Sequence, residues 1–249
     1  MNKTNLVFER ADKKIYRDGD KLVKVFDGNY SKANILNEAL NHARIEETDL
    51  TVPKLQAVQV VDGKWAIILD YIEGTTLQEL MDKNPAKEDE YLNLFVDLQR
   101  TVLSKKVPML NKLKDKMQAK ISAADLDATA RYDLHTRLDS MPKHVNLCHG
   151  DFNPTNVIIT KDGTPYIIDW AHATQGNASA DVARSYLLFY LAGKKELGDK
   201  YLKLYCKKSD TAIQYVQRWI PIVAASRLCK APESEREFLH GWIDVVDYE

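Results

Sequence analysis

The chain has 249 residues, 45% of them hydrophobic, which is enough for one large domain or two unequal lobes with a buried core. Its 35 Lys and Arg residues nearly balance 36 Asp and Glu residues, so the basic excess that nucleic-acid binding demands is missing. No apolar run approaches the ~20 residues of a membrane span, and three scattered cysteines exclude a disulfide framework. We expect a soluble cytoplasmic protein with no nucleic-acid or membrane partner.

The first 72 residues have the pattern of a small antiparallel sheet with one helix. Strands are predicted at 6–8, 14–17, 21–26, 54–61 and 65–69. Turn signals at Asp18-Gly19-Asp20 and Asp62-Gly63 separate two pairs of them. A helix is predicted after Ser31, a suitable N-cap, and its expected apolar face contains Leu36, Ala39, Leu40 and Ala43.

Helices dominate the rest of the chain. They are predicted at 75–83, 86–104, 108–120, 123–140, 179–192, 195–206, 209–230 and 233–247, and one β segment interrupts them at 157–169. Because the character changes near residues 70–74, we place an N-terminal lobe at 1–72 and a C-terminal lobe at 73–249.

The stretch that begins at His149 carries the strongest chemical signal. Asp151 and Asn156 have the D-x4-N spacing of a kinase catalytic loop, and a later apolar run ends in Asp169. Carboxylate and carboxamide oxygens are hard ligands that suit Mg²⁺. Any one of these residues alone is more often a cap or turn former. The three together, at this spacing, favour a catalytic site.

The residues between these ligands predict a hairpin. Asp162-Gly163 is typical of a two-residue loop in which the glycine has positive φ. In that register Ile158 pairs with Ile167, and Asn156 pairs with Asp169. Directly paired side chains have Cβ atoms ~4.5–5.5 Å apart, so both oxygens would reach one metal ion. A three-residue loop would shift this register.

The chain resembles the aminoglycoside phosphotransferase and choline kinase-like family, which shares the protein-kinase fold. The family's H-G-D-x4-N loop stands at 149–156, its I-D-W motif at 168–170, and its G-x4-D-hydrophobic-A-R segment at 176–184. The resemblance runs from about Val7 to Trp242 and is most specific over 149–184. It implies an α+β, two-lobed fold. The small N-lobe, an antiparallel sheet with one helix, would bind nucleotide, and the larger, mainly helical C-lobe would carry the catalytic loop, metal site and acceptor site.

The resemblance implies a role for each residue of the catalytic segment. Asp151 would be the catalytic base that accepts the proton of the acceptor hydroxyl, and His149 would brace the loop. Asn156 and Asp169 would hold Mg²⁺ against the nucleotide phosphates. Asp181, on the following helix, would accept hydrogen bonds from the loop backbone.

The resemblance also implies a nucleotide site in the N-terminal lobe. Lys24 would contact the α- and β-phosphates, with Glu38 as its partner on the helix. Glu38 lies away from the expected apolar face, so that helix would need a second buried face. Adenine would pair with the backbone of a hinge at Asp70 and Ile72. Backbone recognition leaves no side-chain signature, so ATP and GTP both stay open.

The loop between the first two strands departs from the family pattern. Residues 9–14 contain no glycine, so we do not expect backbone N–H groups there to cradle phosphates. Arg10 or Lys13 could supply charge instead. An exposed charged turn is the interpretation that we favour.

Two charged segments bear on the acceptor. The C-terminus carries Asp244, Asp247 and Glu249, which would suit a cationic acceptor near the active site, although a solvated helix end is favoured. The lysines at 105, 106, 112, 114, 116 and 120 form a basic stretch. For these we favour a solvated helical face over a site for an anionic substrate or surface.

The sequence therefore predicts an enzyme that moves the γ-phosphoryl group of ATP or GTP to a hydroxyl of a small molecule, with Mg²⁺ as cofactor. An aminoglycoside, a choline-like amine and a sugar all remain open as acceptors. We expect a monomer or a weak homodimer.

Two other function classes compete with this prediction. A nucleotide-binding pseudokinase or scaffold without transfer activity is the alternative, and only the glycine-free loop favours it. A metal-dependent phosphoesterase is disfavoured, because Gly176-Asn177 is followed by Ala178 where that chemistry needs a histidine. A protein kinase is disfavoured by the missing D-F-G and A-P-E elements.

Overall fold

The computed structural model describes residues 5–10 and 12–244, and contacts divide the chain into two compact units. Unit 1 combines residues 1–85 with 154–172, and unit 2 combines residues 86–153 with 173–249. Segment 154–172 therefore groups with the N-terminal sheet, so unit 1 is larger than the N-terminal lobe expected at 1–72. The division into lobes at 1–72 and 73–249 stays a prediction.

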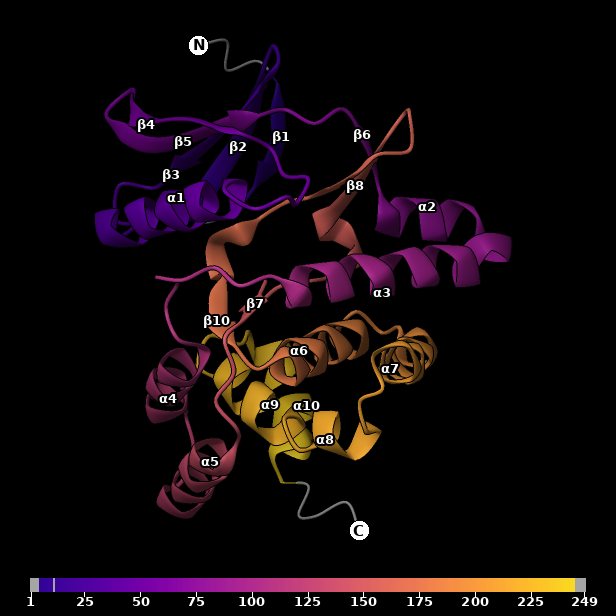
Figure 1. Cartoon of the computed structure of the whole chain (residues 1–249). Coiled ribbons are helices and arrows are strands. Elements are labelled where there is room, and N and C mark those ends of the chain that lie inside the picture. Colours follow the sequence, from indigo (N-terminus) through magenta and orange to yellow (C-terminus); the bar gives the residue numbers. More distant parts are fainter. Residues whose placement is uncertain (1–4, 11, 245–249) are drawn as a thin grey trace. The chain divides into compact units, whose positions relative to one another are not determined.

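Unit 1 contains a five-stranded antiparallel sheet in the order β1-β2-β3-β5-β4 (Figure 1). The hairpins β2–β3 and β4–β5 have the predicted turns. Gly19 has φ +64° between β2 and β3, and Asp62 and Gly63 have φ +48° and +76° between β4 and β5, as a type I′ turn requires. The strands are β1 (Leu6–Glu9), β2 (Lys13–Asp18), β3 (Lys21–Phe26), β4 (Leu55–Val61) and β5 (Lys64–Asp70).

Helix α1 (Lys32–Glu46) packs against β4 and β5, but not through the predicted face. Leu36 and Leu40 are exposed, so the expected apolar stripe is wrong. Two polar interactions determine which face of the helix is buried. Glu38 contacts Lys24, and the His42 ring lies 2.6 Å from the Pro53 carbonyl oxygen. The buried face consists of Ile35, Glu38, Ala39, Asn41, His42 and Ile45.

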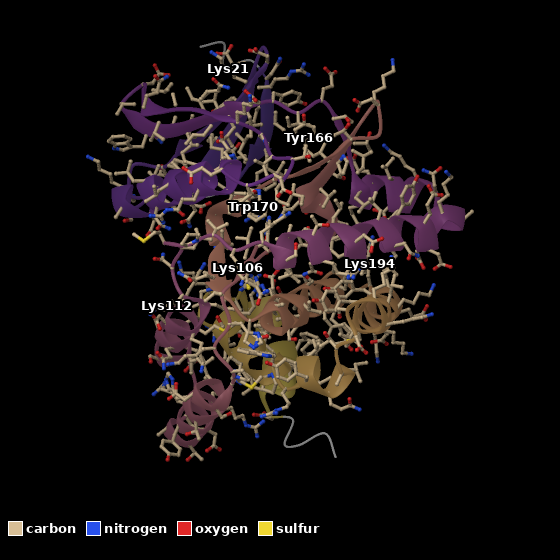
Figure 2. The ribbon with its side chains drawn as sticks, in the orientation of Figure 1. Lys21, Lys106, Lys112, Tyr166, Trp170 and Lys194 are labelled. Carbon is tan, nitrogen blue, oxygen red and sulfur yellow. The ribbon has the colours of Figure 1, made fainter. Side chains whose placement is uncertain are left out.

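A second, three-stranded sheet of unit 1 has the order β6-β8-β9, with strands β6 (Gly74–Thr76), β8 (Val157–Thr160) and β9 (Pro165–Ile167). Gly74 is needed in β6, because a Cβ there would lie 2.5 Å from the Ile159 carbonyl oxygen. Trp170, labelled in Figure 2, is buried and its indole N–H donates to the Ile167 carbonyl. The remaining short elements are α2 (Leu77–Lys83), η1 (Pro85–Lys87), η2 (Pro154–Asn156) and η3 (Trp170–His172).

The β8–β9 hairpin differs from the predicted register by one residue. The expected pairs Ile158–Ile167 and Asn156–Asp169 are wrong. Val157 and Ile167, both buried, now share the inner face of the hairpin. The observed pairs are Val157–Ile167, Ile158–Tyr166 and Ile159–Pro165.

A three-residue loop causes this shift. The Gly163 N–H donates to the Thr160 carbonyl at 2.9 Å, and the Thr160 N–H donates to the Thr164 carbonyl at 3.0 Å. Gly163 has φ +87°, which confirms the predicted positive φ. A type I turn followed by a left-handed glycine is the usual three-residue hairpin loop.

Unit 2 is mainly helical, as predicted. The expected single helix at 209–230 is wrong, because the segment is divided at Arg218-Trp219. Pro221, in the first turn of the second part, lacks a backbone N–H, and in a continuous helix its ring would clash with the carbonyl one turn earlier. No helix of the described residues is long and apolar enough to cross a membrane. The helices are α3 (Glu88–Ser104), α4 (Leu113–Ala123), α5 (Ala128–Ser140), α6 (Ala178–Leu191), α7 (Lys195–Ser209), α8 (Ile213–Gln217), α9 (Ile220–Leu228) and α10 (Glu233–Ile243).

Two short strands of unit 2, β7 (Asn146–Cys148) and β10 (Thr174–Gly176), pair antiparallel and were not predicted. Three residues are too few to show a periodic pattern. They precede the loop that begins at His149 and helix α6, respectively. Their pairing therefore fixes the starting points of both segments.

Candidate active site

Lys24 lies in β3, the middle strand of the five-stranded sheet, and is 5% exposed. Its Nζ donates to Glu38 Oε1 at 3.1 Å and to Asp169 Oδ1 at 3.0 Å. A buried ammonium group is costly unless it is paired. The structure thus brings together three of the residues that the sequence singled out, from a strand, a helix and the segment after β9.

The charges of this cluster are coupled. Burial alone would lower the pKa of Lys24, but the Asp169 and Glu38 carboxylates outweigh burial and raise the pKa above its ordinary value. Lys24 therefore stays cationic at physiological pH. Two carboxylates face one ammonium group, and the Asp169 side chain is 33% exposed, so the excess negative charge lies at the more open end of the cluster.

Asp169 adopts an unusual backbone conformation. Its φ of +62° is left-handed, which is uncommon outside glycine but tolerated by Asp. The preceding residue, Ile168, donates its N–H to the Asn156 carbonyl at 3.0 Å. Asn156 ends η2 and is 8% exposed. The direct pairing of Asn156 with Asp169 does not occur, so the register argument for a shared metal site fails, although this hydrogen bond keeps the two backbone segments adjacent.

The donor chemistry of Asn156 and Asp169 nevertheless fits Mg²⁺, which prefers carboxylate and carbonyl oxygens. Among the residues that the structure describes, no group of three or more His, Cys, Asp or Glu side chains could hold a metal ion. A pair of side-chain oxygens is a sparse site. Mg²⁺ usually binds in this way and keeps waters and substrate phosphates as its other ligands.

The predicted hinge begins at Asp70, the last residue of β5. The Asp70 carboxylate accepts hydrogen bonds from the Lys54 backbone N–H at 3.2 Å and from Gln56 Nε2 at 2.6 Å. Its side chain therefore tethers the segment at the start of β4. Ile72 lies in the irregular segment before β6. Pairing of adenine with the backbone of Asp70 and Ile72 stays a prediction.

The loop between β1 and β2 has the character of an exposed charged turn. Lys14 Nζ lies 2.6 Å from Glu9 Oε1, and both side chains are half exposed. The Arg10 guanidinium lies over the Phe8 ring, 5.2 Å from its centroid. These contacts favour the interpretation of the glycine-free loop as an exposed charged turn.

In unit 2 the loop that begins at His149 is anchored by Asp181 of α6. The Gly150 N–H donates to Asp181 Oδ1 at 2.7 Å and the His149 N–H donates to Oδ2 at 3.3 Å, which confirms the predicted contact with the loop backbone. Burial raises the pKa of the Asp181 carboxyl, and the hydrogen bonds from the loop oppose this shift. Gly150 has φ +78°, a conformation that glycine adopts at little cost.

His149 is fully buried and positions the next turn of the loop. Its Nδ1 accepts a hydrogen bond from the Asp151 N–H at 3.2 Å, which requires an unprotonated Nδ1. Its ring lies edge-on to Phe152, with 5.7 Å between centroids. The Phe152 carbonyl accepts from Ser185 Oγ at 2.7 Å. His149 is thus a positioning residue, and the loop is held on both sides of Asp151.

The Asp151 side chain is 28% exposed and has a cationic neighbour that sequence reasoning missed. Arg184 Nη2 lies 3.8 Å from Asp151 Oδ1. Asn153 Nδ2 donates to the Asp151 carbonyl at 2.9 Å. The only sequence signal for Arg184 was its place at the end of the G-x4-D-hydrophobic-A-R segment, which carried no assigned role. Of the acidic C-terminus, Asp244 is exposed, and Asp247 and Glu249 lie outside the described residues.

A strand lysine that donates hydrogen bonds to a helix glutamate and to an aspartate, together with a loop that carries a carboxylate, is typical of the protein-kinase-like class. The chain belongs to the phosphotransferase enzyme family, whose model matches residues 4–217. No curated protein sequence matches it. The predicted family and the α+β protein-kinase-like fold are confirmed.

Solved structures share this fold at low sequence identity. A thermostable mutant of aminoglycoside phosphotransferase APH(4)-Ia has a TM-score of 0.71 and 15% identity, over 96% of this chain and 92% of that one. Aminoglycoside phosphotransferase APH(3'')-Id from Streptomyces rimosus has a TM-score of 0.59 and 14% identity, over 87% and 91%. Choline kinase LicA from Streptococcus pneumoniae has a TM-score of 0.59 and 15% identity, over 98% and 87%.

Proposed function

We propose that this protein transfers the γ-phosphoryl group of ATP to a hydroxyl of a small molecule. The observation that carries the proposal is the buried contact of Lys24 with both Glu38 and Asp169. In kinases of this fold the strand lysine must pair with the helix glutamate, and the metal-binding aspartate must be in place. A pseudokinase has no need to keep the complete set, so the intact cluster favours transfer over the scaffold alternative.

In the proposed reaction the acceptor oxygen attacks the γ-phosphorus. A bond forms between them while the bond from the γ-phosphorus to the bridging oxygen breaks, and the nucleoside diphosphate leaves. Asp151 accepts the hydroxyl proton. His149 and Asp181 hold the loop so that this carboxylate is presented in a fixed position, which is how a positioned base contributes to rate. In the sequence, four residues separate Asp151 from Asn156.

Lys24 would bind oxygens of the nucleotide phosphates and compensate their negative charge. Asn156 and Asp169 would hold Mg²⁺, which when bound neutralises charge on the phosphates. Neighbouring structures support a nucleotide donor. APH(4)-Ia mutants were solved as ternary complexes with hygromycin B and either AMP-PNP or ADP.

A nucleotide-consumption assay over a panel of acceptors tests this function. Purified protein with Mg²⁺ and ATP or GTP is incubated with aminoglycosides, choline-like amines, sugars, hydroxy acids and sugar phosphates. We expect acceptor-dependent diphosphate formation and an equal amount of a new phosphomonoester signal in the ³¹P NMR spectrum. Nucleotide binding without acceptor-dependent consumption across the panel would favour the pseudokinase alternative.

A further inference from the structure

We propose that three hydrogen-bonded side chains in the core of unit 2 hold the loop backbone next to Asp151 and so position the proposed base. The polar network, as we define it, consists of Tyr201, Gln99 and Ser185. The proposal rests on the proposed function and gives Tyr201 and Gln99 the role of positioning residues.

The polar network connects three helices to the loop. Tyr201, on α7, donates its hydroxyl to Gln99 Oε1 on α3. Gln99 Nε2 donates to Ser185 Oγ on α6 at 3.0 Å, and Ser185 Oγ donates to the Phe152 carbonyl at 2.7 Å. Helices α3 and α6 both pack against α7 (Figure 1). Residues far apart in the sequence thus meet at one carbonyl of the loop.

The donor and acceptor roles follow from the Phe152 carbonyl. A carbonyl oxygen only accepts, so the single hydroxyl proton of Ser185 points at it. The Gln99 atom that faces Ser185 must then be the amide nitrogen, which leaves the amide oxygen for Tyr201. Each group donates to the next one, and the loop backbone at the end of the network fixes the direction of all three bonds.

The polar network lies in an apolar and aromatic environment. Gln99, Ser185, Tyr201 and Phe152 are each at most 1% exposed. The Phe95 ring lies 4.7 Å from that of Phe152 and 5.6 Å from that of Tyr201, centroid to centroid. Burial raises the pKa of the Tyr201 hydroxyl well above its ordinary value, so the hydroxyl keeps its proton at physiological pH. An unpaired polar group is costly in such surroundings, so each member depends on the others.

Gln99 determines where the Ser185 hydroxyl points. A serine inside a helix can donate instead to the carbonyl four residues earlier, which here belongs to Asp181. The N–H of Gln99 occupies one lone pair of Ser185 Oγ, and the hydroxyl proton is directed at Phe152. Without Gln99 the hydroxyl would be free to bond within its own helix, and the Phe152 carbonyl would lose its donor.

The position of that carbonyl gives the network its role. Phe152 directly follows Asp151, whereas Asp181 and His149 hold the loop backbone up to the Asp151 N–H. The network therefore supports the side of Asp151 that the other two contacts do not reach. Apolar side chains of the same shape could fill this space at little cost in stability. A polar network that ends on the loop thus points to positioning of the base, on which its contribution to rate depends.

Backbone amide hydrogen exchange in the full chain tests the network without any acceptor. The test variant, Tyr201→Phe, removes one hydroxyl and keeps the ring. The control, Tyr205→Phe, removes a hydroxyl from a buried ring one turn further along α7, outside the network. A second variant, Gln99→Met/Tyr201→Phe, removes both polar side-chain groups together, so it leaves no unpaired amide in the core if the single substitution prevents folding.

We expect the Gly150 and Asp151 amides, which donate to Asp181 and His149, to exchange about tenfold faster in both network variants than in the control. Amides that exchange only through global unfolding report any general loss of stability, and the loop amides are compared with them. Loop exchange equal to that of the control in both network variants would overturn the proposal.

Turnover then links the network to the reaction. With the acceptor that the panel identifies, we expect kcat of Tyr201→Phe about tenfold below that of Tyr205→Phe and an unchanged KM for ATP, because the base is displaced while the nucleotide site is intact. Faster loop exchange with kcat equal to that of the control would overturn the positioning role. Faster loop exchange in a protein that turns over no acceptor, altered or not, would contradict the proposed function while supporting the contact of the network with the loop.

Discussion

Asp169 has both an unusual backbone conformation and a charged contact with a buried lysine. It has a left-handed backbone with φ +62°, and its carboxylate accepts a hydrogen bond from the buried Lys24. A conformation of this kind costs about 1–3 kcal/mol and persists only where surrounding contacts hold it. Observed strain of this kind points to a functional position. It also means that Asn, which tolerates the same backbone, is the appropriate substitution for a test.

Asp169→Asn tests the metal assignment. In the unaltered protein, ATP and Mg²⁺ together should raise the melting temperature by more than the sum of their separate effects, because each completes the other's site. The substitution should remove this extra shift by taking away the ligand charge. Asp82→Asn, at an exposed carboxylate of the same unit, serves as control and should keep it. An unchanged extra shift in Asp169→Asn would show that Asp169 holds no metal.

Lys116 and Lys120 should give the stability a distinctive pH dependence. Burial on α4 lowers the pKa of each to about 8 in the folded state, whereas unfolded lysines have a pKa of ~10.4. Between these values the unfolded chain binds more protons, so their contribution to the free energy of unfolding rises with pH.

Urea unfolding across this pH window measures that contribution as a difference. The unfolding free energy of the unaltered protein, minus that of Lys116→Gln/Lys120→Gln, should increase with pH through the window. Other titrating groups act in both proteins and largely cancel. Lys112→Gln/Lys203→Gln, at two exposed positions, is the control for the loss of two charges. A difference for Lys116→Gln/Lys120→Gln that does not change with pH would show that the two α4 lysines titrate as solvated side chains.

At the scale of elements, the dipeptide Asp-Gly occurs in two hairpins and closes a loop of different length in each. Asp62-Gly63 closes the two-residue turn that the sequence predicts. Asp162-Gly163 closes a three-residue loop, because Thr164 donates its N–H to Thr160 Oγ1 at 3.1 Å and to Asp162 Oδ1 at 3.2 Å. These side chains offer the backbone an alternative to the tighter turn. The predicted metal geometry depended on the loop length, and therefore failed with it.

Apolar periodicity predicts where most elements lie but not which face a functional helix buries. The expected face of α1 followed its leucines, yet the buried face includes Glu38 and His42. Their burial depends on Lys24 and the Pro53 carbonyl, which lie outside the helix, 14 residues from Glu38 and 11 residues from His42. Pro221, by contrast, is a local signal that predicts the break between α8 and α9 once its position in a helix is weighed.

Gly163→Ala tests the loop at this scale. Nothing lies within 4 Å of the position of an added Cβ, so the strain at φ +87° is the whole effect. We expect a loss of about 1–2 kcal/mol in the free energy of unfolding. Gly28→Ala is the matched control, since Gly28 has equally open space and no positive φ. Equal unfolding free energies for the two variants, measured in urea, would contradict the left-handed loop.

At the scale of the whole chain, family motifs predict the fold and pair Lys24 with Glu38, while one feature stays hidden. Segment 154–172 groups with the N-terminal sheet although it follows residues 149–153 in sequence. Features that depend on contacts between distant segments leave no periodic or motif signal.

The central claim is that Asp151 is the base of a phosphoryl transfer. Its most direct test is the turnover of Asp151→Asn with the acceptor that the panel identifies, measured beside the affinity for ATP. We predict a fall in kcat of ~10²-fold or more with unchanged ATP affinity, because the substitution removes a positioned base and nothing in the nucleotide site. Asp210→Asn, exposed at the end of α7, should keep full activity. Turnover by Asp151→Asn close to that of the unaltered protein would contradict the account.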